Sequence, residues 1–227
     1  ALDLRPAVPA GNAPEDAAAA ARVDGAQNRW FLDPLFGRGY PGDVLSCYRD
    51  LFPDSAAAEV ATFHGRLDFL GVNYYTRSVV RRGEAEPLRG EEIVPAGAET
   101  TATGWEVYPD GLRELLLRLR RDYGPLPLAV TENGAAYDDR PAARGRVDDG
   151  DRLRFLERHL DAAAGAVAAG VPLEAYFVWS LLDNFEWAEG YAKRFGIVHV
   201  DYATQRRTVK ASGAWYAALV DAWRRAR

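Results

Sequence analysis

The chain has 227 residues, of which 48% are hydrophobic and 27% are charged. A chain of this length and composition can form one sizeable hydrophobic core but is too short for two. Its net charge is −5, from 28 basic and 33 acidic residues, and the basic residues are scattered in ones and twos, so we expect no nucleic-acid partner. Cys47 is the only cysteine, which excludes an internal disulfide and a zinc site built from paired cysteines.

The sequence offers no signal that would direct the chain to a membrane or out of the cell. No apolar run approaches the roughly 18 residues that a membrane helix needs, and the N-terminus lacks a basic region followed by an apolar one. We therefore expect a cytoplasmic protein without a membrane partner. The chain contains no methionine, even at position 1, from which we expect that a segment upstream of residue 1 is missing or has been removed.

Apolar runs typical of β-strands recur at long intervals and predict four strands, over residues 2–8, 67–72, 126–130 and 175–179. Between them, apolar residues repeat every three or four positions after Pro109 and again after Asp149, which predicts helices. The Ala-rich stretches at 17–21 and 162–169 are also typical of packed helix. Strand, long connection and helix alternate, as expected of an α/β protein with a parallel sheet.

Two of the long connections are rich in turn residues. Gly37, Gly39 and Gly42 fit a dinucleotide-binding pattern, but Pro34 interrupts any strand before them, so a surface turn is the better interpretation. The charged segment 81–99 predicts a small exposed hairpin.

Four β/α units are half of the eight that close a (β/α)8 TIM barrel. No linker divides the chain, so we predict half of such a barrel in a single domain. An unclosed half exposes two strand edges and an apolar inner face. A separate partner half, an oligomer partner or a longer parent chain would each cover them.

Polar and aromatic residues collect where the predicted strands end. Glu132 follows the third strand and precedes Asn133-Gly134, and parallel barrels keep catalytic groups at this end of their strands. On the local sequence alone, a solvated acid beside an ordinary turn is the favoured interpretation of Glu132, and only the series of motifs below favours a catalytic group. Residues 176–191 combine tryptophans, other aromatics and acids, a mixture that suits sugars, because pyranose rings stack on indole while their hydroxyls bind carboxylates.

Five segments resemble, in order and spacing, the signatures of glycoside hydrolase family 1, the β-glucosidase and β-galactosidase group. They are residues 69–76, 104–112, 130–134, 179–191 and 193–201. Residues 14–16 and 28–35 are similar to the family's fifth barrel strand region and the helix after it. The resemblance implies that residues 1–227 are the C-terminal, second half of a single (β/α)8 glycosidase domain.

By this resemblance Glu132 is the catalytic nucleophile. It would form a covalent glycosyl-enzyme in a double displacement that retains the anomeric configuration. Tyr75 would hydrogen-bond Glu132 and keep it ionised and aimed, and Asn73 would order the same pocket.

The resemblance also implies a set of substrate-binding residues. Glu186 would bind the 4- and 6-hydroxyls of the sugar and Trp187 the 3-hydroxyl. Trp179 would form the stacking floor, Phe195 the wall, and Trp105 the aglycone side. The expected substrate is a terminal β-D-glucoside or oligosaccharide, because Glu186 would repel the phosphate of a 6-phosphoglycoside.

No cofactor or metal is implied. His64, His159 and His199 lie far apart without metal-ligand spacing, so we expect them to be structural.

The family's general acid/base is the Glu of an Asn-Glu-Pro motif, which does not occur in these 227 residues. Retaining hydrolysis needs two carboxyl groups roughly 5 to 5.5 Å apart, so this chain alone is expected to hydrolyse ordinary glycosides poorly. The rival hypothesis is a catalytically silent sugar-binding or assembly fragment, a half-barrel that needs a partner chain.

Overall fold

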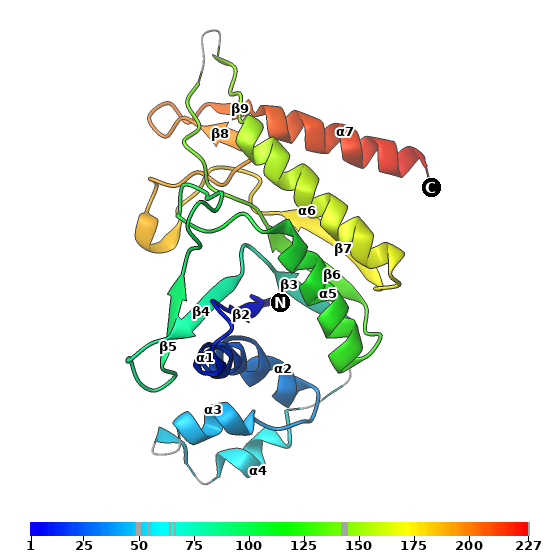
Figure 1. Cartoon of the computed structure of the whole chain (residues 1–227). Helices are drawn as coiled ribbons and strands as arrows, with labels where there is room; N and C mark the ends of the chain where they lie inside the picture. Colours follow the sequence, from blue (N-terminus) through cyan, green and yellow to red (C-terminus); the bar gives the residue numbers. More distant parts are fainter. Residues whose placement is uncertain (49–50, 54, 64, 66, 142–144, 227) are drawn as a thin grey trace.

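The computed structural model describes residues 1–227 except 49–50, 54, 64, 66, 142–144 and 227 (Figure 1). Its central sheet has four parallel strands in the order β1 (Leu2–Asp3), β3 (Leu70–Asn73), β6 (Leu128–Asn133) and β7 (Leu173–Val178). Among these four strands, those that are adjacent in the sheet also follow one another along the chain. The prediction of four such strands is confirmed, with bounds shifted by a few residues.

Long helices follow three of these strands and cover one face of the sheet. They are α5 (Pro109–Tyr123), α6 (Gly150–Ala168) and α7 (Ala211–Arg225), and Figure 1 shows them side by side, with α6 between α5 and α7. Pro109 suits the first position of α5, where no amide hydrogen is needed. The predicted apolar stripe of α5 lies in the core of the molecule. The four leucines of the stripe are at most 2% exposed: Leu112, Leu115, Leu116 and Leu119.

The connection from β1 to β3 is a group of shorter helices. These are α1 (Pro14–Asp24), a π-helical turn (Gly25–Arg29), α2 (Trp30–Leu35), α3 (Gly42–Cys47) and α4 (Ala56–Val60). Asp24 on α1 accepts hydrogen bonds from Arg118 on α5 and so ties this group to the sheet-covering helices. Gly37 and Gly39 adopt positive φ angles of 73° and 74° in the predicted surface turn.

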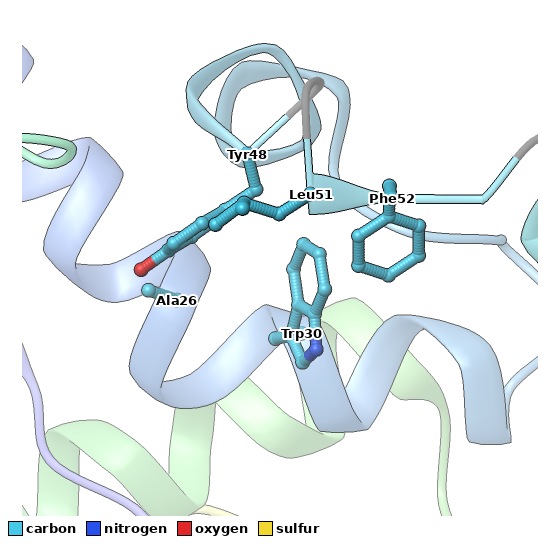
Figure 2. A pocket seen from close by; sticks show the side chains of 5 residues that line it. All are labelled: Ala26, Trp30, Tyr48, Leu51 and Phe52. Carbon is cyan, nitrogen blue, oxygen red and sulfur yellow. The ribbon is translucent and has the colours of Figure 1, made fainter.

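An aromatic pocket of about 300 Å³ opens between these short helices (Figure 2). Trp30 stands at its centre, with Tyr48 and Phe52 edge-on at ring-centroid distances of 5.8 and 5.1 Å. None of the predicted site residues lines it.

The predicted strand over residues 2–8 is divided into two. Beyond β1 the chain leaves the barrel sheet, and β2 (Ala7–Pro9) pairs in parallel with β4 (Ser78–Arg82). Pro6 lies at the break; it has no amide hydrogen to donate, while its carbonyl accepts from the Ser78 amide at 2.9 Å. Strand β4 also pairs with β5 (Gly90–Ile93), which confirms the hairpin. A further hairpin joins β8 (Val198–Val200) to β9 (Arg207–Val209).

The sheet face turned away from the helices carries exposed aromatic side chains. Leu70 and Tyr176 pack into the core beneath the helices, and successive strand residues point to opposite faces. Their neighbours Phe69 and Phe177 therefore face the other way, where they are 57% and 56% exposed. This face is that of an unclosed barrel. In the part of the chain that the structure describes, no helix is long and apolar enough to cross a bilayer.

His159 on α6 is fully buried, and its ring stacks on Phe155 at 3.8 Å. Nδ1 lies 2.7 Å from the Phe155 carbonyl oxygen, so Nδ1 is the protonated nitrogen of the neutral ring. Nε2 has no hydrogen-bond partner among the described residues. Burial lowers the pKa of His159 to about 4, and burial also lowers the pKa of His199. His64 lies outside the described residues.

This burial predicts a loss of stability in mild acid. Between pH 6.5, where a free imidazole titrates, and about 4, where His159 titrates, the unfolded chain binds a proton that the folded chain does not. Folding is therefore destabilised as the pH falls through this window, by about 3 kcal/mol in all. Urea unfolding of the wild type and of His159→Leu at pH 7 and pH 4 measures it. The variant keeps His199 and should lose less stability than the wild type; an equal loss contradicts the assignment.

Candidate active site

Glu132 lies near the end of β6 and is held by the residues that directly follow the neighbouring strand β3. The hydroxyl of Tyr75 donates a hydrogen bond to Glu132 Oε2, and the Tyr74 amide donates to the Glu132 carbonyl at 2.9 Å. Burial raises the pKa of Tyr75, and the hydrogen bond to Glu132 raises it further. Tyr75 therefore stays protonated as a donor, and Oε1 of Glu132 is left for another partner.

Asn73 is the register partner of Glu132 across the β3–β6 pair, at a point where the register shifts. Its Oδ1 accepts a hydrogen bond from the Thr131 hydroxyl at 2.6 Å. The bond orients the Asn73 side chain at the same strand end as Glu132.

Asn133 and Gly134 have structural roles that differ from those of a hairpin turn. Asn133 is fully buried, donates from Nδ2 to the Tyr74 carbonyl at 2.8 Å and accepts from the Tyr176 hydroxyl. One amide thus joins β3, β6 and β7 directly beside Glu132. A Cβ on Gly134 would lie 1.8 Å from the Trp179 carbonyl oxygen, so glycine is needed for the close approach of the chain after β7. The interpretation of Glu132 as a solvated acid beside an ordinary turn does not fit this packing.

Two further aromatic rings stand beside Tyr75, the tyrosine that binds Glu132. Trp105 lies 5.5 Å from Tyr75 and 6.1 Å from Phe195, and Phe195 lies 6.2 Å from Tyr75, all between ring centroids. Phe195 is almost fully buried, whereas Trp105 is half-buried. The sequence analysis missed Arg5, whose guanidinium lies 5.9 Å from the Trp105 ring. Arg5 falls inside the strand predicted over residues 2–8, whereas β1 ends at Asp3, so the sequence carried no signal for it.

The Trp105 loop is fastened to β4 by an ion pair. Arg77 binds both carboxylate oxygens of Glu106, at 2.8 and 3.0 Å, and its guanidinium covers the Tyr108 ring at 3.6 Å. This bidentate contact fixes the backbone next to Trp105.

Glu186 is the second acid of the site. Burial raises the pKa of Glu186, the negative charge of Glu132 raises it further, and a hydrogen bond from the Trp179 side chain opposes both. Its Oε2 is buried without a hydrogen-bond partner among the described residues. A buried carboxylate oxygen is costly unless something binds it.

Trp187 differs from the other predicted site residues. Its side chain is 82% exposed and its φ is 45°. Within the described part of the chain, its side chain makes no hydrogen bond or ring contact with Glu186 or Trp179. The structure therefore brings together Glu132, Tyr75, Asn73, Glu186, Trp179, Trp105 and Phe195, and leaves Trp187 at the surface. Within the described ranges no group of three metal-ligating side chains is found.

The amino-acid sequence of the chain matches a known family. The family model described as Glycosyl hydrolase family 1 matches residues 1–224. The chain belongs to glycosyl hydrolase family 1. The thermostable beta-glucosidase B of Thermobispora bispora is 48% identical over 88% of this chain and 42% of its own length. Beta-glucosidase A of Thermotoga maritima is 44% identical over 84% of this chain and 42% of its own length.

Solved structures of the family agree. The family 1 β-glucosidase from Thermotoga maritima superposes with a TM-score of 0.92 at 40% identity, covering 96% of this chain and 49% of that one. The same enzyme in complex with deoxynojirimycin gives a TM-score of 0.92. The chain thus spans about half the length of the family 1 relatives it matches and corresponds to a C-terminal portion of them. Its four β/α units are half of the family's barrel, as predicted.

Proposed function

We propose that the complete protein to which this chain belongs is a retaining β-glycosidase that hydrolyses terminal β-D-glucosides. The observation that carries the proposal is the orientation of Glu132 at the strand end together with the buried free oxygen of Glu186. Glu132 is oriented by the Tyr75 hydroxyl, and Glu186 presents a buried oxygen that has no partner among the described residues. The names of the relatives, which are β-glucosidases, support it.

In the proposed mechanism Glu132 is the nucleophile. Tyr75 binds Oε2, so Oε1 attacks the anomeric carbon as the bond to the aglycone oxygen breaks. The covalent glycosyl-enzyme is then hydrolysed by water, which releases Glu132 and retains the configuration. A donor on the non-attacking oxygen aims the carboxylate without neutralising it. Asn73, fixed by Thr131, would order the same pocket.

The sugar would lie between Glu132 and Glu186. Oε2 of Glu186 would accept hydrogen bonds from the 4- and 6-hydroxyls, while Trp179, which holds the other side of Glu186, forms the stacking floor. Phe195 would line the wall and Trp105 the aglycone side. Trp187 would reach the 3-hydroxyl. Glu186 would repel a phosphate dianion, so the proposed substrate is a neutral glycoside, and no cofactor takes part.

We place the general acid/base outside these 227 residues. The acid/base group has to stand roughly 5 to 5.5 Å from the nucleophile, and the Asn-Glu-Pro motif that would supply it is not in this sequence. We propose that it lies on the other half of the same single domain, which would also cover Phe177 and the rest of the exposed sheet face.

A second candidate is a catalytically silent half-barrel that binds sugar or assembles with a partner chain. The missing Asn-Glu-Pro motif favours it. The two candidates differ in whether Glu132 forms a covalent bond to a sugar.

A 2-deoxy-2-fluoro glucoside with a dinitrophenyl leaving group tests this difference, because the leaving group departs without acid assistance. The protein is produced from the complete reading frame that encodes the chain, incubated with the reagent and weighed intact. We expect a mass increase of one fluorosugar that maps to the peptide containing Glu132. Glu99→Gln, which alters an exposed ion pair with Arg158, should label like the wild type. A folded protein that stays unlabelled contradicts the glycosidase and favours the silent half-barrel.

A further inference from the structure

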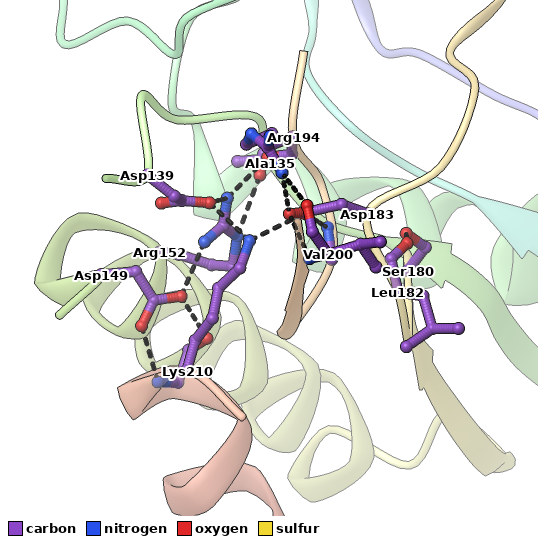
Figure 3. Close-up of polar contacts among 12 residues, drawn as sticks. Ala135, Asp139, Asp149, Arg152, Ser180, Leu182, Asp183, Arg194, Val200 and Lys210 are labelled. Atoms are coloured by element: carbon purple, nitrogen blue, oxygen red, sulfur yellow. Dashed lines mark hydrogen bonds and ion pairs between the residues drawn. The ribbon is translucent and has the colours of Figure 1, made fainter. Parts of the chain in front are cut away.

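Six charged side chains form a cluster between the loops that follow β6 and β7 (Figure 3). Three are acids and three are bases, and all except Arg194 are buried: Asp139, Asp149, Arg152, Asp183, Arg194 and Lys210. The charges balance within the cluster. Replacing a buried ion pair by apolar packing is often neutral or stabilising, so stability is a weak explanation for a cluster of this size.

Lys210 is the ammonium that joins the two loops. It stands immediately before α7, and its Nζ donates to Asp139 at 2.5 Å and to Asp183 at 2.8 Å. Asp139 lies in the loop that leaves β6, the strand of Glu132. Asp183 lies in the loop that leaves β7 and is three residues before Glu186. Lys210 thus connects the loop after the strand of Glu132 to the loop that contains Glu186.

Asp183 passes this connection on to the segment that contains Phe195. It accepts hydrogen bonds from Arg194 Nη1 at 2.6 Å, from the Gly196 amide at 3.1 Å and from the Val200 amide at 3.2 Å. A Cβ on Gly196 would lie 2.2 Å from the Asp183 amide nitrogen, so the two segments are in direct backbone contact. Burial raises the pKa of Asp183, but Lys210 and Arg194 outweigh it and hold the pKa below its ordinary value.

Arg152 on α6 holds the other side of the cluster. It pairs with Asp139 and Asp149, each at 2.6 Å, and donates to the carbonyls of Ala135 and Arg194. Without Lys210, Asp139 would still have Arg152, and Asp183 would still have Arg194. Loss of the ammonium would therefore remove the direct bridge between Asp139 and Asp183 while leaving each acid paired with a guanidinium, and Arg152 would still connect Asp139 to the Arg194 carbonyl.

We propose that Lys210 is a positioning residue that sets the distance of Glu186 and Phe195 from Glu132, and thereby the selection of the sugar at the first subsite. The inference rests on the proposed function, in which Glu186 binds the 4- and 6-hydroxyls. Lys210 would not touch the substrate. Its effect reaches the sugar through Asp183 and the loop that follows it.

The test uses the protein from the complete reading frame and the variant Lys210→Met, which keeps the length of the side chain and removes the charge. kcat/KM is measured for an aryl β-glucoside and for the aryl β-xyloside, which is the same ring without the 6-hydroxymethyl group. We expect the preference for the glucoside to fall about tenfold, because a charged hydrogen bond that depends on loop position is weakened. The Kd of deoxynojirimycin should rise by a similar factor.

The control is Arg118→Met, which removes a partly buried ion pair to Asp24 between α5 and α1. It should lower stability and leave the substrate ratio unchanged, because a smaller folded fraction lowers both rates equally. If Lys210→Met does not fold, Asp139→Asn weakens the same link and should lower the ratio about threefold.

The outcomes separate the two levels of the proposal. An unaltered protein that hydrolyses neither substrate, or does not distinguish them, overturns the assigned role of Glu186 and this inference with it. An active, selective protein whose ratio is unchanged in Lys210→Met, or in Asp139→Asn where the first variant does not fold, overturns the positioning role alone.

Discussion

Replacing Glu132 with Gln is expected to lower kcat of the complete protein on an aryl β-glucoside by at least about 10⁴-fold, the order seen when a nucleophile is removed from an enzyme. Gln has the shape of Glu, and its carbonyl oxygen can still accept the hydrogen bond from Tyr75. It cannot form the ester to the anomeric carbon. Steady-state rates and the fluorosugar label should therefore both be lost, while thermal unfolding stays close to that of the wild type.

The variant Glu106→Gln is the control, because it removes a different carboxylate near the site. Glu106 is close to the site and pairs with Arg77, but it holds the Trp105 loop and has no role in bond breaking. Its loss should raise KM more than it lowers kcat. A Glu132→Gln protein that keeps more than about a hundredth of wild-type kcat would rule out Glu132 as the nucleophile and leave Glu186 as the acid to examine.

The sequence located the strands and their ends because each barrel strand is a short apolar run followed by polar residues. Glu132 was found in this way, whereas Tyr75 and Glu186 were named through the resemblance to the family; the parallel sheet places the ends of β3, β6 and β7 at one edge. The division of the first run at Pro6 was missed, because hydrophobicity continues through Val8 while the hydrogen-bond partner changes from β3 to β4. Pairing with a strand about 70 residues away leaves no local signal.

The buried charges were missed for a related reason. Arg152 and Lys210 look like the scattered surface bases of an acidic chain, yet both are fully buried. Their partners are carboxylates 3 to 71 residues away along the chain. Composition cannot show which acid pairs with which base. Asn133 is similar: its residue type favours turns, and only the three-strand packing reveals its use as a cross-link.

The buried cluster also carries the largest expected effect on stability. Arg152→Met should lower the free energy of unfolding at pH 7 by about 3 to 5 kcal/mol, because it leaves a buried negative charge uncompensated. Arg152 satisfies Asp139, Asp149 and the carbonyls of Ala135 and Arg194. Lys210 and Ser212 would remain as partners of the two acids, but three carboxylates would then face two cations.

Arg154→Met is the matched control, two residues further along the same helix. Its ion pair with Asp151 is more than half exposed on both sides, so its loss should change the free energy of unfolding by at most about 0.5 kcal/mol. Urea unfolding of both variants gives the comparison. In Arg152→Met the excess buried charge raises the folded-state pKa of an acid in the cluster above its unfolded value, so the folded form binds the extra proton. The deficit relative to the wild type should therefore shrink between pH 7 and pH 4. A deficit that is below 1 kcal/mol, or that stays constant with pH, would mean that water reaches the cluster once the guanidinium is gone.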